Sequence, residues 1–305
     1  LELTETIRAK EKRGSLLWVL DKTKTAMGGR LLRAWMERPL LSPAQITRRL
    51  TAVEELVKKT IDREELILSL REITDFERAM TRIMTGTASC RDLAALSQGA
   101  ASLPAVKERL SGMRSPYLQA LFEQLDTLAD LKEKIDATIV DDPPFLLREG
   151  GLIRDGANKE LDDLRAVQSG GKGMLTQIEA REKERTGIRN LRVGYNRVFG
   201  YYIEVAKGQL NLVPDSYIRK QTLSTGERYI TEELKELEST ILTAKDRIVA
   251  LEYDLFVALR QFVAGESARV KQTAQAVAQL DVLCSFAAVA VHNNYCSCLL
   301  YTSPS

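Results

Sequence analysis

Residues 234–262 read LKELESTILTAKDRIVALEYDLFVALRQF, and apolar side chains recur through them in alternating steps of three and four residues. The recurring positions are Leu234, Leu237, Ile241, Ala244, Ile248, Leu251, Leu255, Ala258 and Phe262. Such a heptad repeat lines one side of an α-helix with an apolar seam, which needs a second helix to cover it. Thr231 precedes the repeat as a helix N-cap residue, so the sequence predicts a rod of about 42 Å at 1.5 Å per residue.

The nearest partner helix precedes this rod in the sequence. Residues 157–183 have a helical pattern that carries Leu161, Leu164, Leu175 and Ile178, and this helix would run antiparallel to the seam. Within it, the run Gly170-Gly171-Lys172-Gly173 lacks the earlier glycine, the following Ser or Thr and the preceding strand of a phosphate-binding loop. We therefore expect the run to interrupt the helix.

Between these two helices the hydrophobic period drops toward two. Leu191, Val193 and Tyr195 alternate with Arg192 and Gly194, and residues 201–206 repeat the alternation. This pattern predicts two strands joined by a hairpin turn at residues 196–200. Residues 217–223 and 227–230 predict a second pair of strands, joined by Ser224, Thr225 and Gly226. We expect a small antiparallel sheet at the tip of the two long helices.

The first part of the chain, to about residue 140, has helical spacing and predicts a helix bundle. Ser42, Pro43 and Gln45 predict a helix start, with Ser42 as N-cap and Gln45 completing a capping box. Residues 141–144, Asp-Asp-Pro-Pro, end this block. The expected fold class is mainly α, a helical bundle with long antiparallel helices and a small antiparallel β-sheet inserted at their tip.

Composition argues against most kinds of enzyme. His292 is the single histidine, so Ser-His-Asp, Cys-His and multi-histidine metal sites lack their material. The four cysteines have no disulfide or paired zinc spacing, and the net charge of +2 does not by itself favour a polyanionic partner. We expect no catalytic residue, no metal and no membrane span, because the chain shows neither a signal-peptide pattern nor an apolar run of about 18 residues. A soluble, cytoplasmic protein is the expectation.

Basic residues gather around the predicted sheet, and they are Lys183, Arg185, Arg189, Arg192, Arg197, Arg219 and Lys220. Asn196, Ser224 and Thr225 stand at its predicted turns. Cations together with short polar side chains at turns are typical of contacts to nucleic-acid phosphates. The alternative is an ordinary mixed-charge surface, in which these bases pair with Glu182, Glu184, Glu204 and Glu227. The aromatic side chains Tyr195, Phe199, Tyr201 and Tyr202 could stack on bases, but for most of them we expect a place in the core.

Two stretches resemble the bacterial MutS family of DNA mismatch-repair proteins. Residues 14–32, GSLLWVLDKTKTAMGGRLL, look like the segment entering the family's core domain. Residues 193–205, VGYNRVFGYYIEV, with 219–223, RKQTL, and 227–230, ERYI, are similar to its clamp domain. The likeness extends over residues 1–295. Residues 296–305 depart from the family's pattern and look like a non-native tail, so Cys296 and Cys298 carry no functional argument.

The resemblance implies a division into a core and lever part at 1–169, a clamp at 170–232 and a returning lever helix at 233–295. It implies that the clamp grips the backbone of duplex DNA without sequence specificity and that the levers transmit this engagement. Asn196, Arg197, Ser224 and Thr225 become the expected DNA-binding residues, with Lys220 as a further candidate.

For the intact protein the resemblance implies a homodimer, the repair partner MutL, and ATP with Mg in a domain that this fragment lacks, together with the mismatch-reading domain. The chain itself is therefore expected to be no enzyme and to hold no cofactor. The alternative function is a coiled-coil scaffold or dimerisation module that binds protein through the heptad seam.

Overall fold

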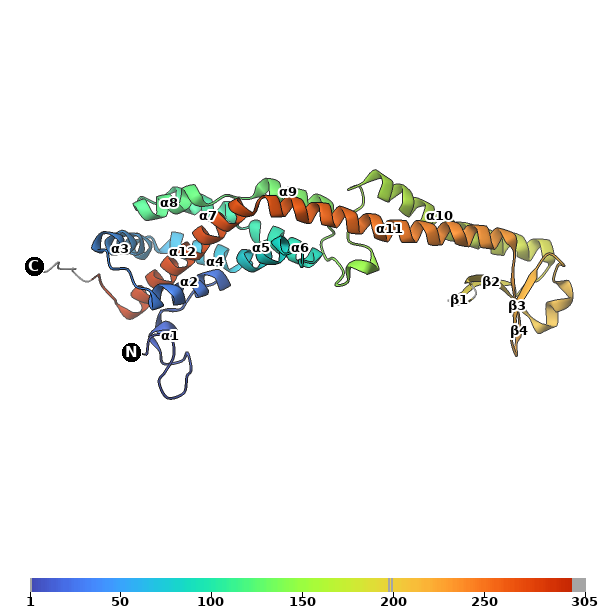
Figure 1. Cartoon of the computed structure of the whole chain (residues 1–305), viewed down its shortest axis with the longest axis horizontal. Helices are drawn as coiled ribbons and strands as arrows, with labels where there is room; N and C mark the ends of the chain where they lie inside the picture. Colours follow the sequence, from blue (N-terminus) through green and yellow to red (C-terminus); the bar gives the residue numbers. More distant parts are fainter. Residues whose placement is uncertain (1, 197, 199, 298–305) are drawn as a thin grey trace, which may run out of the picture. The chain divides into compact units, whose positions relative to one another are not determined.

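The computed structural model describes residues 2–196, 198 and 200–297. The chain divides into two compact units (Figure 1), a helical unit of residues 1–145 with 256–305 and a sheet unit of residues 146–255. The helical unit is built from short helices around one long one, and the sheet unit holds a small antiparallel sheet on two long helices. The expected fold class is confirmed.

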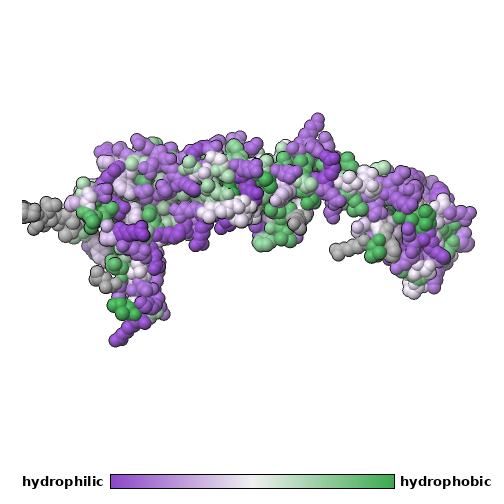
Figure 2. All heavy atoms as spheres, viewed as in Figure 1, coloured by the Kyte–Doolittle hydropathy of each residue, from purple (hydrophilic) through white to green (hydrophobic). Residues whose placement is uncertain are grey.

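Helix α12 (Ser267–Asn293) is the central element of the helical unit, and it packs against α1, α2, α3, α4, α5 and α8. The other helices of this unit are α1 (Leu16–Leu20), α2 (Ala26–Glu37), α3 (Pro43–Lys58), α4 (Thr60–Arg71), α5 (Phe76–Met84), α6 (Cys90–Ala100), α7 (Leu103–Ser111), α8 (Pro116–Gln124) and α9 (Ala129–Thr138). By length and composition α12 could cross a membrane, but 67% of its most apolar stretch is buried inside the protein. The surface of the unit that Figure 2 shows is mostly hydrophilic. A helix that is apolar all round and lies beneath such a surface is the core helix of the unit.

A buried carboxylate fixes the entry to α2 against α12. Asp281 accepts hydrogen bonds from the backbone nitrogens of Lys24 and Thr25, at 2.9 and 2.7 Å, and from the Thr25 hydroxyl at 2.7 Å. Burial raises the pKa of Asp281, although these hydrogen bonds act in the opposite direction. Gly28 is required here, because a Cβ at this position would lie 2.2 Å from the Asp281 carboxylate oxygen.

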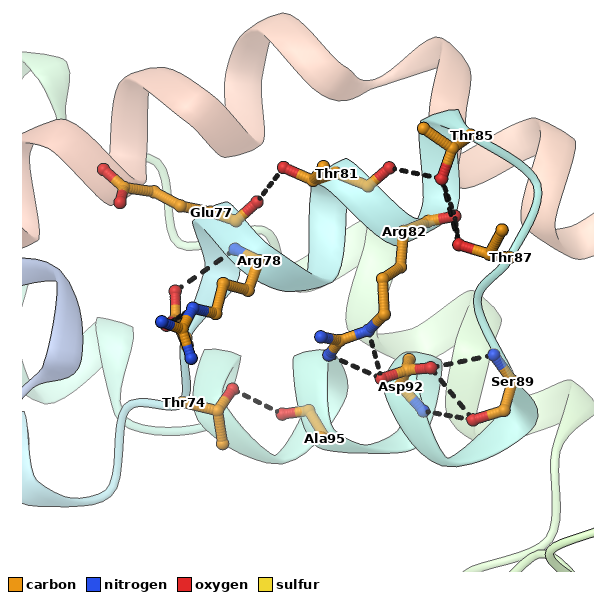
Figure 3. Close-up of polar contacts among 11 residues, drawn as sticks. Thr74, Glu77, Arg78, Thr81, Arg82, Thr85, Thr87, Ser89, Asp92 and Ala95 are labelled. Carbon is orange, nitrogen blue, oxygen red and sulfur yellow. Dashed lines mark hydrogen bonds and ion pairs between the residues drawn. The ribbon is translucent and has the colours of Figure 1, made fainter.

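Helix α3 begins at Pro43 after Ser42, as predicted, but Ser42 makes no side-chain capping bond. The predicted capping box is therefore wrong at this position. Figure 3 shows such a box at the start of α6, where the Asp92 backbone nitrogen donates to Ser89 Oγ and the Ser89 nitrogen donates to Asp92 Oδ2 at 2.8 Å. Arg82 on α5 also donates to Asp92, at 2.9 Å, so the same carboxylate joins two helices.

The sheet unit contains four antiparallel strands in the order β1, β2, β4, β3. The strands are β1 (Arg192–Asn196), β2 (Gly200–Ala206), β3 (Ile218–Thr222) and β4 (Gly226–Ile230), and their bounds are close to those of the predicted segments. The short 3-10 helices η1 (Leu147–Glu149) and η2 (Lys207–Leu212) complete the unit. One face of the sheet, which carries Ile203, Val205 and Tyr229, packs on buried side chains such as Leu234 and Leu237 of the long helix that follows. Alternation along the strands places Glu204 and Arg228, which pair with each other across β2 and β4, on the opposite face.

The two long helices of this unit are α10 (Lys159–Thr186) and α11 (Glu232–Gly265). They run antiparallel, because Arg247 pairs with Glu160 at 2.8 Å near one end and Arg181 pairs with Glu233 near the other. The predicted interruption at Gly170 to Gly173 is wrong, since α10 continues through these residues. A glycine is needed at position 171, because an added Cβ would lie 2.6 Å from Cγ1 of Ile241 on α11.

A buried ion pair holds the segment that leads into α10. Glu252 on α11 is 1% exposed and accepts from Arg165 at 2.6 Å and from the Leu152 backbone nitrogen at 3.0 Å. Arg165 also donates to the Ile153 carbonyl at 2.7 Å. Both helices therefore share one polar contact with the chain at residues 152–153.

The apolar seam of α11 follows the predicted heptad only in its first half. Leu234, Leu237, Ile241, Ala244 and Ile248 are buried, but Phe262 is 43% exposed and Ala258 is exposed as well. The buried positions continue instead as Glu252, Phe256, Leu259 and Val263. An α-helix has 3.6 residues per turn, so it drifts about 20° per heptad against a 3.5 repeat and after four heptads presents the neighbouring residue.

Candidate nucleic-acid interface

The turn between β3 and β4 forms one end of the sheet. Its closing bond runs from the Leu223 backbone nitrogen to the Gly226 carbonyl at 2.7 Å. Gly226 lies so close to β2 that a Cβ would come within 2.3 Å of the Val205 carbonyl oxygen, so only glycine allows this approach. Ser224 and Thr225 are exposed at the turn, and neither hydroxyl is hydrogen bonded to any residue that the structure describes.

Lys220 lies on the edge strand β3, just before this turn. The pairing with β4 shifts between Arg219 and Gln221, which makes Lys220 the extra residue of a β-bulge. A bulge redirects side chains and twists an edge strand, and a lysine at such an edge also discourages pairing with another chain. Lys220 is exposed and has no ion pair among the described residues, so its charge is available to a ligand.

Lys207 belongs to the same end of the sheet, although the sequence analysis missed it. Its backbone nitrogen donates to the Thr225 carbonyl at 3.1 Å, which places it beside the turn. Its side chain is exposed and, within the described part of the chain, unpaired. The available signal was its position as the first residue after the predicted strand at 201–206, since a lysine at the end of a strand is usually exposed. We call Lys207, Lys220, Ser224 and Thr225 the sheet tip.

Asn196 lies at the opposite end of the sheet. The register pairs Asn196 with Gly200, whereas the sheet tip adjoins the pair formed by Ala206 and Gly226. The side-chain oxygen of Asn196 accepts a hydrogen bond from the Val198 backbone nitrogen at 2.8 Å, which is a local turn contact. Arg197 lies outside the described residues. The structure thus brings Ser224, Thr225 and Lys220 together and separates them from Asn196.

Several of the other cations near the sheet are paired with carboxylates, as the mixed-charge alternative predicted, whereas Arg189 and Arg192 are exposed and have no ion pair among the described residues. Lys183 pairs with Glu179 at 2.6 Å and Arg185 with Glu182 at 2.6 Å, and their hydrogen bonds contribute to lowering the pKa of both carboxyl groups. On the strands, Arg219 meets Glu227 at 3.4 Å, and Arg228 meets Glu204 at 2.9 Å. The charges of these cations are therefore partly neutralised within the unit.

The carboxylates of α10 also bind the sheet through its backbone. Glu179 accepts from the Val193 nitrogen at 2.9 Å, and the buried Glu182 accepts from the Tyr217 hydroxyl at 2.6 Å. Burial, followed by this hydrogen bond, raises the pKa of Tyr217. Glu179 and Glu182 of α10 therefore position the sheet on this helix.

The aromatic residues divide between the two faces of the sheet. Tyr201 packs against the core cluster, as expected, but Tyr195 is 51% exposed. Tyr202 lies on the outer face, where the Arg228 guanidinium stands 4.2 Å from its ring centroid. The expectation of core places is therefore wrong for Tyr195 and Tyr202, and Phe199 lies outside the described residues.

Comparison with known proteins identifies the family. A sequence model described as MutS domain III matches residues 1–287. This chain belongs to the MutS family. It is 51% identical over 296 residues to the DNA mismatch repair protein MutS of Ruminiclostridium cellulolyticum, covering 97% of this chain and 34% of that protein. The MutS proteins of Acetivibrio thermocellus and Symbiobacterium thermophilum are each 50% identical, with the same coverage.

The chain thus spans about a third of the length of the curated MutS relatives that it matches. Among the described residues, neither an acidic cluster for Mg nor a phosphate loop for ATP, the groups that the resemblance implies for MutS proteins, is present. No group of three or more His, Cys, Asp or Glu side chains is placed to hold a metal ion among the described residues. The glycines at 170–173 lie inside α10 and not at the strand-to-helix turn of a phosphate loop. No nucleotide hydrolysis is assigned to these residues.

Proposed function

We propose that this part of a MutS protein grips the phosphate backbone of duplex DNA through the sheet tip. Two lysines without an ion pair among the described residues gather with two exposed hydroxyls at one end of a sheet, near which several other cations are paired with carboxylates. This juxtaposition carries the proposal. Lysines supply the salt-dependent attraction to phosphates, and serine and threonine hydroxyls donate hydrogen bonds to phosphate oxygens. Contacts to phosphates carry no sequence information, so we expect the grip to be independent of sequence and of mismatches.

We further propose that α11 transmits this engagement. One continuous helix leads from the end of β4 at Ile230 to Gly265, and Leu255 and Phe256 on it belong to different units. In the intact protein this would couple DNA contact to the nucleotide-dependent steps of the ATPase domain, within a homodimer that recruits MutL in the cytoplasm. If α11 transmits the contact, duplex DNA slows hydrogen exchange in amides 256–265, whereas unchanged exchange there would remove the lever proposal.

The scaffold alternative has less support from the geometry. The first half of the heptad seam is covered within the chain, because Gly171 of α10 lies directly against Ile241 and Leu237. A module that binds partner proteins through this seam would leave it exposed. Sedimentation of the chain without DNA distinguishes the two, since a scaffold assembles through α11 irrespective of salt and of the sheet tip.

The decisive experiment is a fluorescence-anisotropy titration with matched and mismatched duplexes over a salt series. The chain should bind both duplexes equally. Replacing Lys207 and Lys220 together by alanine should weaken binding and reduce the slope of log K against log salt by about 1.8, because each phosphate contact contributes about 0.9.

Lys159→Ala with Lys245→Ala is the matched control. Both residues are exposed cations of the same unit, without ion pairs among the described residues, so the net charge changes equally. An equal loss in both double variants would show that only the overall charge matters and would reject the sheet tip. Measurable ATP turnover by the purified chain would contradict the placement of hydrolysis in another domain.

A further inference from the structure

A second group of cations surrounds a cavity in the helical unit. The cavity has a volume of about 330 Å³ and is lined by Lys22, Lys24, Glu64, Ile67, Arg71, Ala288, Val289, His292 and Asn293. Small-ligand sites begin at roughly 300 Å³. The lining comes from three places in the sequence, which are the loop between α1 and α2, helix α4 and the end of α12. All of them belong to one compact unit.

The two lysines and the arginine of the cavity have no carboxylate partner among the described residues. Lys24 and Arg71 make no side-chain ion pair or hydrogen bond there, and Lys22 has only the Trp18 ring, at 5.9 Å from its centroid. The backbone of Lys24 is held by Asp281, so its side chain leaves a fixed point of the main chain. The Lys24 ammonium group can therefore bind an anion from a fixed position of the main chain.

The single acid in the lining does not neutralise them. Glu64 is bound by the adjacent Arg63, whose guanidinium is buried and approaches the carboxylate at 3.1 Å. Asp21 in the same loop is likewise bound by Lys12 and by the Thr23 hydroxyl. The cavity therefore carries an excess of positive charge.

Helix dipoles account for only part of this excess. Arg71 stands in the last turn of α4 and His292 in the last turn of α12, and the Arg71 cation is stabilised by the partial negative charge of the carbonyl end of its helix, which also offsets part of the cavity's positive charge. Lys22 and Lys24 lie outside any helix, so this explanation does not apply to them. The floor of the cavity includes the buried, apolar Ile67 and Val289, beside which the attraction of an anion is less screened than in bulk water.

We propose that this cavity binds a small phosphate-bearing anion. Lysine ammonium groups act as point charges toward phosphate oxygens, and the Arg71 fork adds paired donors. Asn293 and His292 at the rim offer further hydrogen-bond donors. The size suits a diphosphate group, and the site is separate from the sheet tip in both residues and compact unit. Binding requires no bond to be made or broken.

Isothermal titration of the chain with pyrophosphate at low ionic strength tests the proposal. Saturable binding at one site per chain is expected. Lys24→Ala with Arg71→Ala should bind about a hundredfold more weakly, because each of the two lost charge-assisted hydrogen bonds accounts for about one decade in affinity. Intrinsic fluorescence of Trp18 and Trp35 would confirm that the helical unit of the variant is folded.

Lys271→Ala with Arg114→Ala is the matched control, since both are exposed cations of the same unit without side-chain partners in the described chain. It should leave pyrophosphate binding unchanged, as should the double alanine variant of Lys207 and Lys220. Absence of saturable binding, or equal weakening by the control, would overturn the proposal. Citrate that binds as tightly as pyrophosphate would also overturn it, in favour of a site for the carboxylates of an acidic protein segment.

Discussion

The drift of the α11 seam can be tested with two phenylalanines of the same helix. The heptad repeat places Phe262 in the seam, whereas the structure leaves it 43% exposed and buries Phe256 completely. Truncating a buried phenylalanine to alanine removes its transfer free energy and leaves a cavity, at a cost of about 3 to 5 kcal/mol. Phe262→Ala removes a ring that is nearly half in water, so its cost should stay near 1 kcal/mol.

The assay is urea denaturation followed by tryptophan fluorescence. Trp18 and Trp35 are the two tryptophans of the chain and both lie in the helical unit, so their emission reports the unit that contains Phe256. With a slope of about 2 kcal/mol per molar urea, Phe256→Ala should lower the midpoint by about 1.5 to 2.5 M, and Phe262→Ala by about 0.5 M. A larger loss for Phe262→Ala, or equal losses, would show that α11 keeps the heptad phase, and the argument from helical drift would fail.

Two further predictions concern packing and pH. Gly171→Leu should destabilise the sheet unit by about 1 to 3 kcal/mol, because even a Cβ would lie 2.6 Å from Ile241, and faster hydrogen exchange in α10 would reveal it. The Arg30 guanidinium hydrogen bonds to Asp75 and holds the pKa of that carboxyl below its usual value, despite partial burial. A depressed folded-state pKa adds stability above the unfolded value of about 3.9, and this stability is lost as pH falls through the folded value. Asp75→Asn should therefore reduce the dependence of the urea midpoint on pH below about pH 4 and leave its dependence on pH near pH 7 unchanged.

Several elements were predictable because their signals are local. Alternation in residues 191–206 predicted β1 and β2, since a strand places successive side chains on opposite faces. Leu161 and Ile178 marked α10 as the partner of α11, and the short sheet segment between the helices required an antiparallel return. The glycine run at 170–173 misled, because glycine ordinarily weakens a helix, whereas here it permits close approach to Ile241.

The candidate site was only partly predictable. Ser224, Thr225 and Lys220 were recognised from turn position and charge, and the structure places them together with Lys207. Asn196 was grouped with them because both turns were assumed to lie at one tip. The pairing of Ala206 with Gly226 separates the turns, since it sets the start of β4 beside the end of β2.

The sequence by itself determined which segments are helices and strands, how the long helices pair, and which family the residues resemble. Each of these rests on periodicity or on a contiguous motif, which neighbouring residues carry on their own. Tertiary structure decided which cations have no carboxylate partner among the described residues and over which half of α11 the buried positions follow the heptad repeat. Ion pairs such as Arg228 with Glu204 or Arg165 with Glu252 join residues 24 and 87 positions apart, so availability of a charge depends on packing that no local pattern records.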